Sequence, residues 1–363
     1  MSETNSMTAN RRKFLAASAT LAGAGVAAPA VVRAQTRTWR MVTSWPKNLP
    51  GPGTTAQFLA DQITAMSHGR LSVTVHAAGE LVPGLGVLDA VAGKVAQMGH
   101  TASFFWTGKM EAAAFFTAVP FGLTPLEHIA WVEQGGGQDL WDQLYEPFRV
   151  KPLMAGNTGM QMGGWLKKEV KSLEDLKGLR FRIPGLGGAM MKKLGVVPVL
   201  MAPSEILPAL QSGAIDGTEF LGPWSDRAAG FHKAANNYYW PGFHEPNGSA
   251  ECLVNLKSWG NLPDELKLVV KNACRAANVL GLAESEWRNA EALQALKKDG
   301  VNLRRWPDDI VRAARDAAGQ VILEFGQGSD IEQRIYLSYE TMRARARNWS
   351  QIGAEAYLTA RNG

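Results

Sequence analysis

Charged residues stand in apolar, turn-rich stretches of the chain where they could bind a ligand. Arg182 lies near the end of a strand predicted over 179–183, directly before a Pro-Gly turn. An arginine at the strand ends of an open α/β sheet can hold a carboxylate through two parallel hydrogen bonds. Taken alone, an arginine on a surface strand remains the competing interpretation.

Glu219 and Glu245 place two carboxylates in a similar setting. Glu219 stands at the end of another predicted strand, 214–220, and Glu245 lies in the turn-rich run 241–246. An unpaired carboxylate is costly in apolar surroundings, so each of the two needs a cation, an arginine or solvent. Together with Arg182, they are the candidates for chemistry in this chain.

Common enzyme motifs are absent from the sequence. It contains no G-x-S-x-G elbow, no H-E-x-x-H pair and no Walker A loop. Its six histidines are scattered without a close pair, which disfavours a metal site built from histidine. The glycines of 184–188 lack the spacing of a dinucleotide-binding loop and are typical of a tight turn before a helix. We therefore predict a protein that is not an enzyme.

Strands alternate with helices in two successive parts of the chain, which predicts a mostly parallel α/β sheet in each. The pattern restarts after the helical stretch 125–145. A helix-glycine-strand unit at 87–99 is echoed at 207–219. This suggests two similar lobes with a ligand in the cleft between them. From residue 263 onward the pattern is helical, ending in a long amphipathic helix over 329–360.

The first 34 residues resemble a twin-arginine (Tat) signal peptide. Arg11-Arg12 precede an uncharged run rich in alanine and glycine, and 32–34 resembles a cleavage site. A membrane anchor is the alternative, because the run is about long enough to span a bilayer. Cleavage removes four basic residues and one acidic residue, which lowers the net charge of the 363-residue chain from +5 to +2. Such a chain, without a basic stripe, gives no support to nucleic-acid binding.

Cys252 and Cys274 are the only cysteines in the sequence. In an exported chain they could form a disulfide, and two half-buried free thiols are the alternative interpretation. The two cysteines lack a C-x-x-C spacing, which argues against zinc binding, redox chemistry or haem attachment.

Several short motifs, in the right order along the chain, resemble those of DctP-type substrate-binding proteins of TRAP transporters. The segment 179–185 (LRFRIPG) is similar to the carboxylate-binding signature of that family, and 97–99 (QMG) and 213–217 (GAIDG) are similar to two further motifs. Three segments resemble the subgroup that binds 2-oxo acids or lactate with a metal ion: 157–165 (NTGMQMGGW), 219–223 (EFLGP) and 239–246 (YWPGFHEP). The resemblance covers essentially the whole mature chain.

The resemblance implies a role for each residue that matches the subgroup. Arg182 would form the salt bridge to the ligand carboxylate, and Gln161 would contact both ligand and metal. Glu219, the main-chain carbonyl of Phe220 and Glu245 would complete the metal shell. The subgroup often has tryptophan where this chain has Phe220. Phenylalanine keeps the main-chain oxygen that would bind the metal, but it covers less of the pocket wall and has no indole N–H. The change therefore affects the size of the ligand that fits more than it affects metal binding.

The charges of the implied site favour a bound cation. Two glutamates, one arginine and a ligand carboxylate leave two uncompensated negative charges, which a partly closed cleft opposes. Calcium would cancel them and sodium would halve them, and both ions prefer oxygen ligands. A bound cation can also be chelated by the ligand's α-oxygen. The site would therefore select 2-oxo or 2-hydroxy acids over carboxylates that lack this oxygen. On the resemblance we predict sodium, with calcium as the alternative.

The predicted fold class is α/β, a two-lobe periplasmic binding-protein fold (type II-like) with a helical C-terminal extension. We predict a signal peptide over 1–34, lobe I from 35–158 plus 248–300, lobe II from 159–247, and C-terminal helices over 301–363. The last of these resembles the dimerising helix of the subgroup, which favours a homodimer.

The predicted function is that of an extracytoplasmic solute receptor in the periplasm. It would capture a small pyruvate-like 2-oxo monocarboxylate through the arginine and the cation, and deliver it to the membrane subunits of a TRAP transporter. The same role for lactate or another 2-hydroxy acid with calcium is one alternative. A Tat-exported periplasmic enzyme, and a sensor or assembly subunit that uses the same cleft, are the others.

Overall fold

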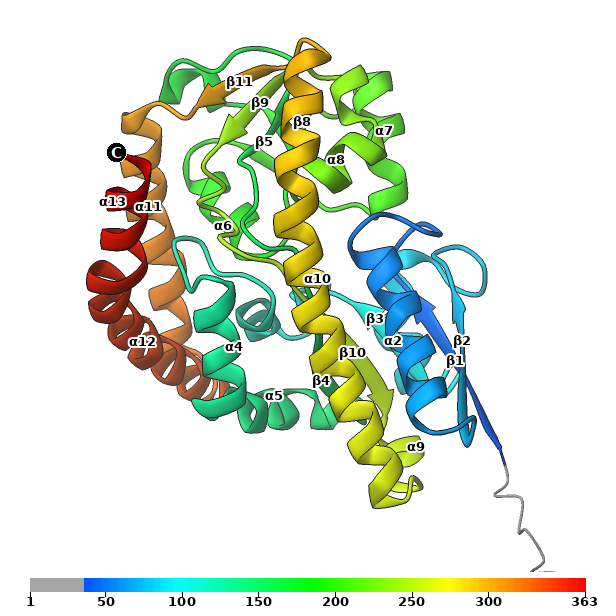
Figure 1. The fold of residues 1–363 in the computed structure, drawn as a ribbon. Coiled ribbons are helices and arrows are strands. Elements are labelled where there is room, and N and C mark those ends of the chain that lie inside the picture. The colour runs from blue at the N-terminus through cyan, green and yellow to red at the C-terminus, as the bar shows by residue number, and fades with distance from the viewer. Residues whose placement is uncertain (1–35) are drawn as a thin grey trace, which may run out of the picture. The chain divides into compact units, whose positions relative to one another are not determined.

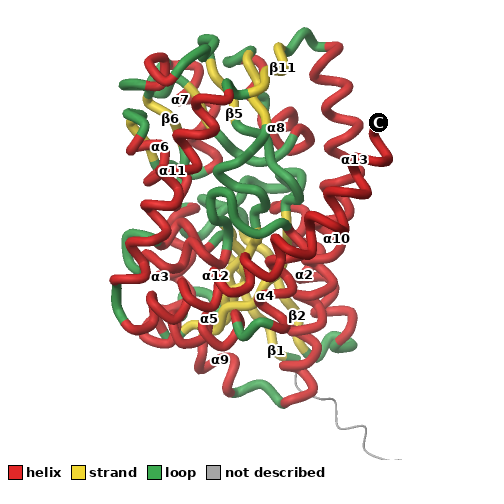
Figure 2. The backbone as a smooth tube through the Cα atoms, turned by 90° about the vertical axis from the view of Figure 1, so that its left-hand side faces the viewer, coloured by secondary structure: helices red, strands yellow, loops and turns green. Residues whose placement is uncertain are grey.

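Two separate β-sheets organise the computed structural model, which describes residues 36–363. The predicted signal peptide therefore lies outside the described residues. Sheet I has the strand order β2-β1-β3-β10-β4, and sheet II has the order β11-β9-β5-β8-β6-β7. Figure 2 shows their strands as two groups with loops between them. The strands of sheet I are β1 (Arg37–Thr43), β2 (Leu71–His76), β3 (Met98–Thr101), β4 (Val150–Asn157) and β10 (Ser249–Asn255). Those of sheet II are β5 (Gly164–Leu166), β6 (Arg180–Arg182), β7 (Val197–Val199), β8 (Gly217–Thr218), β9 (Asn237–Trp240) and β11 (Asn302–Arg305).

Helices cover the sheets and connect their strands (Figure 1). The shorter ones are α2 (Pro52–Met66), α3 (Val87–Ala92), α4 (Pro125–Gln134), α5 (Gly137–Tyr145), α6 (Gly185–Lys193), α7 (Pro203–Ser212), α8 (Pro223–Ala229) and α9 (Leu256–Gly260). The C-terminal ones are α10 (Asp264–Lys298), α11 (Asp308–Glu324), α12 (Asp330–Ser350) and α13 (Ala356–Asn362). The 35 residues of α10 make a helix about 50 Å long. This helix packs against α2 and β4 at sheet I and against α8 near sheet II, so it braces both sheets.

Both sheets are mixed, whereas the sequence pattern predicted mostly parallel ones. In sheet I, β1 pairs in parallel with β2 and β3, while β10 is antiparallel to β3 and β4. In sheet II, β5 is antiparallel to β8 and β9, while β6 is parallel to β7 and β8. The chain enters β5 directly from sheet I and β10 directly from sheet II. Each antiparallel strand thus follows a crossing between sheets, which the local pattern does not reveal.

Three local predictions differ from the structure. The segment after residue 263 is not helical throughout, because β11 pairs in parallel with β9 at the edge of sheet II. Its sequence, Asn-Leu-Arg-Arg, is half-exposed and polar, so it lacks the apolar alternation of a buried strand.

Helix α7 begins at Pro203 with Ala202 as N-cap, not with Ser204, and Glu205 accepts the Ala202 N–H at 3.1 Å. The final helix is interrupted by a π-helical turn over Gln351–Glu355.

The two cysteines lie on neighbouring elements. Cys252 on β10 and Cys274 on α10 are both buried, and no disulfide joins them. A hydrogen bond with Cys274, followed by burial, raises the pKa of the Cys252 thiol well above its usual range. Cys252 therefore packs as a protonated thiol in the core.

Candidate functional site

The predicted site residues come together at the carboxyl ends of two parallel strands. Arg182 ends β6, which pairs with β8, so Glu219 emerges beside it as the first residue after β8. Gln161 lies in the connection from β4 to β5, and Glu245 in the connection from β9 to β10. All of these side chains are buried. One cavity, with an empty volume of about 390 Å³, is lined by four of the five predicted residues: Gln161, Arg182, Phe220 and Glu245.

Arg182 is held in place by groups of sheet II. Its Nη1 donates to the Glu219 carboxylate in an ion pair whose side chains are 2% and 1% exposed. Its Nη2 lies 3.5 Å from the carbonyl oxygen of Met201. Within residues 36–363, Arg182 Nε has no hydrogen-bond partner. A buried guanidinium thus keeps an N–H for a further acceptor.

Glu245 is a second buried carboxylate close to Glu219. Burial, followed by the charge of Glu219, raises the pKa of Glu245 well above its usual range, while the charge of Arg182 opposes the rise. One ligating atom from each of Glu219, His244 and Glu245 lies within 4.8 Å of the others. Two carboxylates at this range repel each other unless a proton or a cation intervenes.

The side-chain amide of Gln161 faces further oxygen atoms. One of its terminal atoms lies 2.9 Å from Thr158 Oγ1. The other lies 3.2 Å from the Phe220 carbonyl oxygen and 3.3 Å from Glu245 Oε2. With nitrogen in the second position, the amide donates to both oxygens. With oxygen there, three oxygens converge as they do around a hard cation, so the donor set fits one.

Two glycines allow the backbone to approach Gln161 closely. A Cβ at Gly248 would lie 2.4 Å from Gln161 Nε2, and a Cβ at Gly242 would lie 2.4 Å from the Gln161 carbonyl oxygen. Both distances are too short for a Cβ atom unless its neighbour shifts. Because the two glycines flank Glu245, the connection from β9 to β10 can bring this carboxylate against the amide.

His244 belongs to the cluster, although sequence reasoning assigned it no role. Its Nε2 lies 3.3 Å from Glu219 Oε2, and its side chain is 3% exposed. Both carboxylate oxygens of Glu219 are thus engaged, one by Arg182 and one by His244. In the sequence, the one sign of a role for His244 is its position beside Glu245 in a turn. That position does not distinguish a binding-site histidine from one that only packs in the core.

The opposite wall of the cavity comes from segments next to sheet I. Trp45, Phe104 and Phe105 line it. Trp45 Nε1 donates to His100 Nδ1 at 2.8 Å, and His100 Nε2 contacts the Ala155 carbonyl oxygen at 2.9 Å. Burial lowers the pKa of His100 to about 4, so it is neutral and its Nε2 carries the proton. Trp45 is therefore held in place by a partner that occupies its N–H.

Glu251 holds the segment that carries the two phenylalanines. Its Oε2 accepts from Ser103 Oγ at 2.8 Å and its Oε1 accepts from Trp106 Nε1 at 2.7 Å. These donors are the two ends of the 3-10 helix Ser103–Trp106, with Phe104 and Phe105 between them. Burial raises the pKa of Glu251 to about 7. One buried carboxyl thus positions this part of the cavity wall.

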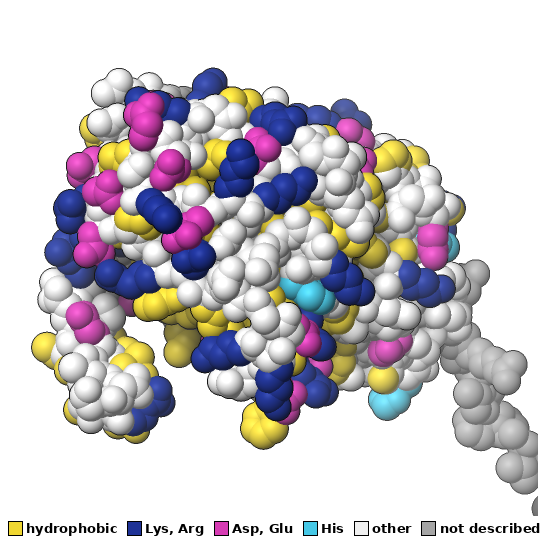
Figure 3. Space-filling view, turned by 90° about the horizontal axis from the view of Figure 1, so that it is seen from above, with side chains coloured by type: hydrophobic (Ala, Val, Ile, Leu, Met, Phe, Trp, Pro, Cys, Tyr) yellow, Lys and Arg dark blue, Asp and Glu magenta, His cyan; other side chains and the backbone are white. Residues whose placement is uncertain are grey.

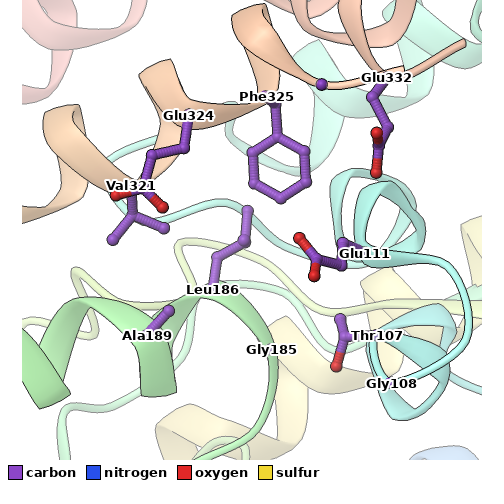
Figure 4. Close-up of a pocket in the computed structure, with 11 residues that line it drawn as sticks. Thr107, Gly108, Glu111, Gly185, Leu186, Ala189, Val321, Glu324, Phe325 and Glu332 are labelled. Atoms are coloured by element: carbon purple, nitrogen blue, oxygen red, sulfur yellow. The ribbon is translucent and has the colours of Figure 1, made fainter. Parts of the chain in front are cut away.

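A larger cavity, with an empty volume of about 870 Å³, lies elsewhere (Figure 4). Leu186 and Phe325 project into it, and its charged lining residues are Glu111, Glu324 and Glu332. Among residues 36–363, no arginine or lysine lines it, whereas Arg182 lines the smaller cavity.

Figure 3 shows how charged side chains are distributed on one face of the described residues. On the face shown in Figure 3, basic and acidic side chains are interspersed rather than gathered into a basic stripe. Among the described residues, no helix combines the length and the apolar character needed to cross a membrane.

Residues 41–328 match the family described as bacterial extracellular solute-binding protein, family 7 (DctP). The chain belongs to this family. Family 7 consists of solute-binding proteins, which confirms the predictions of a binding function and of a protein that is not an enzyme. This family 7 protein is 42% identical over 319 residues to a protein of Nostoc sp. named a monocarboxylate 2-oxoacid-binding periplasmic protein, with 88% of this chain and 87% of the relative covered.

Two solved structures share its fold. One is a TRAP periplasmic solute-binding protein from Pseudoalteromonas atlantica with bound sodium and pyruvate, at 35% identity and a TM-score of 0.87, covering 90% of this chain and 99% of that one. The other, from Colwellia psychrerythraea, has bound calcium and pyruvate, at 35% identity and a TM-score of 0.87, covering 90% and 100%. The predicted two-lobe binding-protein fold of this family 7 chain is confirmed.

Proposed function

We propose that this family 7 protein is the extracytoplasmic receptor of a TRAP transporter and captures a small 2-oxo monocarboxylate such as pyruvate. The observation that carries the proposal is one cavity lined by both Arg182, whose Nε has no partner within residues 36–363, and the oxygen cluster of Gln161, Phe220 and Glu245. The Nostoc relative and the two pyruvate-bound structures support the same ligand class.

Arg182 binds the ligand carboxylate. Within residues 36–363 its Nε has no hydrogen-bond partner and its Nη2 makes only a long contact to a carbonyl, so this edge of the guanidinium can receive two carboxylate oxygens. Glu219 occupies the other edge and holds the fork in place. The same ion pair keeps the arginine charge compensated, so a ligand carboxylate adds a negative charge that something else must balance.

A hard cation balances that charge. Gln161, Glu219, the carbonyl of Phe220 and Glu245 supply only oxygen atoms, which suits sodium or calcium. The bound ion would let the carboxylate and the 2-oxygen of one acid chelate together. Arg182 and Gln161 orient the acid, and the aromatic wall beside sheet I excludes water and limits its length.

We propose sodium as the resident ion, with calcium as the alternative. The Pseudoalteromonas structure holds sodium and the Colwellia structure holds calcium. Calcium would neutralise a site with two carboxylates and a bound acid more completely than sodium. Calcium with a 2-hydroxy acid such as lactate is therefore the second ligand combination to be tested.

Phe220 sets the size of the cavity beside the metal position. Its ring packs edge-on against Phe231, with the ring centroids 5.5 Å apart, and its carbonyl oxygen faces Gln161. Where the subgroup often has an indole, the smaller ring leaves more space. We expect the chain to accept acids somewhat longer than pyruvate.

The proposal extends to the surroundings of the receptor. Relatives named as periplasmic binding proteins support a periplasmic location, to which the Tat-type signal of residues 1–34 would direct the chain. TRAP membrane subunits would receive the ligand.

Exposed apolar side chains near the C-terminus support a homodimer, since Trp349 is 70% exposed and Ile352 is 74% exposed. Analytical ultracentrifugation of the wild type and Trp349→Glu tests that assembly, because a dimer should dissociate in the variant.

A thermal-shift screen tests the proposed ligand. Pyruvate, 2-oxobutyrate, lactate and acetate are each added to the purified protein with sodium, with calcium or with neither ion. Ligand binding raises the unfolding temperature with the ratio of ligand concentration to Kd. We expect the two 2-oxo acids to give a cation-dependent shift and acetate to give none. A shift of equal size with acetate, or a shift indifferent to both cations, would contradict the chelated site.

A further inference from the structure

Two buried hydroxyl groups line the ligand cavity without hydrogen-bond partners. Thr117 and Ser249 are each 1% exposed, and both residues line the same cavity as Arg182 and Gln161. Among residues 36–363, no group bonds Thr117 Oγ1 or Ser249 Oγ. Buried hydroxyls are satisfied in the large majority of cases, so two exceptions in one cavity point to a missing partner.

The backbone explains why the two hydroxyls belong together. Ser249 N donates to the carbonyl oxygen of Thr117 at 3.1 Å, which joins the start of β10 to the residue after the 3-10 helix Glu111–Phe116. Thr117 N is itself bonded to the carbonyl of Ala114 at 3.1 Å. Their backbone N–H groups are therefore used, while the two hydroxyls have no partner within residues 36–363.

Neighbouring hydroxyls differ from this pair. Thr158 Oγ1 is engaged by the Gln161 amide at 2.9 Å and by Gly248 N at 3.0 Å. Ser103 Oγ is engaged by Glu251. The other wall residues on this side, Ala102, Phe105 and Ala250, offer no side-chain polar atom. Among the described side chains on this wall, these two hydroxyls are the groups left to bond a ligand, since Trp45 Nε1 is already bonded to His100.

Their place relative to the oxygen cluster indicates which part of a ligand they reach. Ser249 directly follows Gly248, whose backbone lies so close to the Gln161 amide that a Cβ there would collide with it. Ser249 therefore stands next to the place where the oxygen atoms of the acid would bind. A hydroxyl donates one hydrogen bond, and a bound 2-oxo acid offers oxygen lone pairs beyond those taken by an arginine and a cation.

We infer that Thr117 and Ser249 donate hydrogen bonds to the oxygens of the bound acid and determine ligand specificity from the side of sheet I. This inference rests on the proposed function. The acid is then bonded from both sides of the cavity, by Arg182 on one and by the hydroxyl pair on the other. A ligand without oxygens facing the pair leaves two buried donors unpaired, which the site rejects.

Calorimetric titration of pyruvate into Thr117→Val and Ser249→Ala tests the inference. Thr117→Val keeps the side-chain shape and removes only the hydroxyl. Each variant should bind pyruvate about tenfold to a hundredfold more weakly than the wild type, while the unfolding temperature of the ligand-free protein stays equal or rises. Thr117→Ser, which keeps a hydroxyl, should retain most of the affinity.

Thr64→Val is the matched control. Thr64 Oγ1 on α2 donates to the carbonyl of Ala60 at 2.9 Å and accepts from Val73 N at 3.2 Å, and it does not line the cavity. This variant should lose stability and keep its pyruvate affinity, the reverse of Thr117→Val.

Wild-type affinity in both Thr117→Val and Ser249→Ala would overturn the inference and leave the proposed function intact. A wild-type protein that binds none of the small 2-oxo acids would overturn both. Should Thr117→Val fail to fold, Ser249→Ala and Thr117→Ser decide the question, because an affinity loss in the first with retention in the second supports the hydroxyl role.

Discussion

Glu251→Gln should remove the pH dependence that one buried carboxyl imposes on stability. The side chain is fully buried, and its hydrogen-bond partners are the neutral donors Ser103 and Trp106. Burial raises its pKa from 4.5 to about 7. Between these values the folded chain keeps a proton that the unfolded chain has released. Unfolding then takes place with loss of a proton, so this group makes the folded state less stable as pH rises from 4.5 to 7.

The size of the effect follows from the two pKa values. One pKa unit corresponds to about 1.4 kcal/mol, so crossing the whole window changes the free energy of unfolding by on the order of 3 kcal/mol. Glutamine cannot ionise. The variant should therefore gain stability relative to the wild type as pH rises, by that amount between pH 4.5 and values above 7.

Urea unfolding of both proteins at several pH values in this window measures the difference directly. Asp226→Asn is an independent second case in sheet II, because burial raises the pKa of Asp226 from 3.8 to about 7 and its partners are Trp165, Tyr238 and the Leu221 N–H. Glu340→Gln, which removes a carboxylate paired with Arg343 on α12, controls for the substitution itself. A constant offset between wild type and Glu251→Gln at every pH would refute the reasoning.

Three substitutions test the ligand site. Arg182→Lys keeps a positive charge for Glu219 but loses the planar fork, so we expect pyruvate affinity to fall about tenfold to a hundredfold by calorimetry, and an unchanged affinity would remove the arginine from the site. Phe220→Trp keeps the main-chain oxygen and fills space, so binding should stay cation-dependent while 2-oxobutyrate loses more affinity than pyruvate. The same loss for both acids would argue against Phe220 as a size determinant. Gly248→Ala places a Cβ 2.4 Å from Gln161 Nε2 and should displace the amide, weakening pyruvate and cation binding by at least about tenfold, whereas wild-type affinities would show that Gln161 is not held as described.

The candidate residues were accessible from the sequence because each stands at a recognisable break. Arg182 and Glu219 end strands, and Glu245 lies in a run of Pro and Gly. Their chemical types, an arginine and two acids in apolar surroundings, already required a partner for each. Family-like motifs supplied Gln161 and Phe220, whose local sequences carry no chemical signal of their own.

What the sequence could not reveal depends on pairing between distant strands. The ion pair of Arg182 with Glu219 arises because β6 lies beside β8 in parallel, a register that no local pattern encodes. Thr117 and Ser249 are ordinary hydroxyl residues until burial leaves them unpaired. Strand β11 is too polar and too short to be recognised before its partner β9 is known.

The direct test of the central claim is a calorimetric titration of pyruvate into metal-stripped protein, repeated after sodium or calcium is restored. We expect weak or undetectable binding without a cation and recovery of tight binding with at least one of the two ions, because the carboxylates of Glu219 and Glu245 and the ligand carboxylate need a positive charge beyond Arg182. Equal pyruvate affinity in the stripped and restored protein would contradict it.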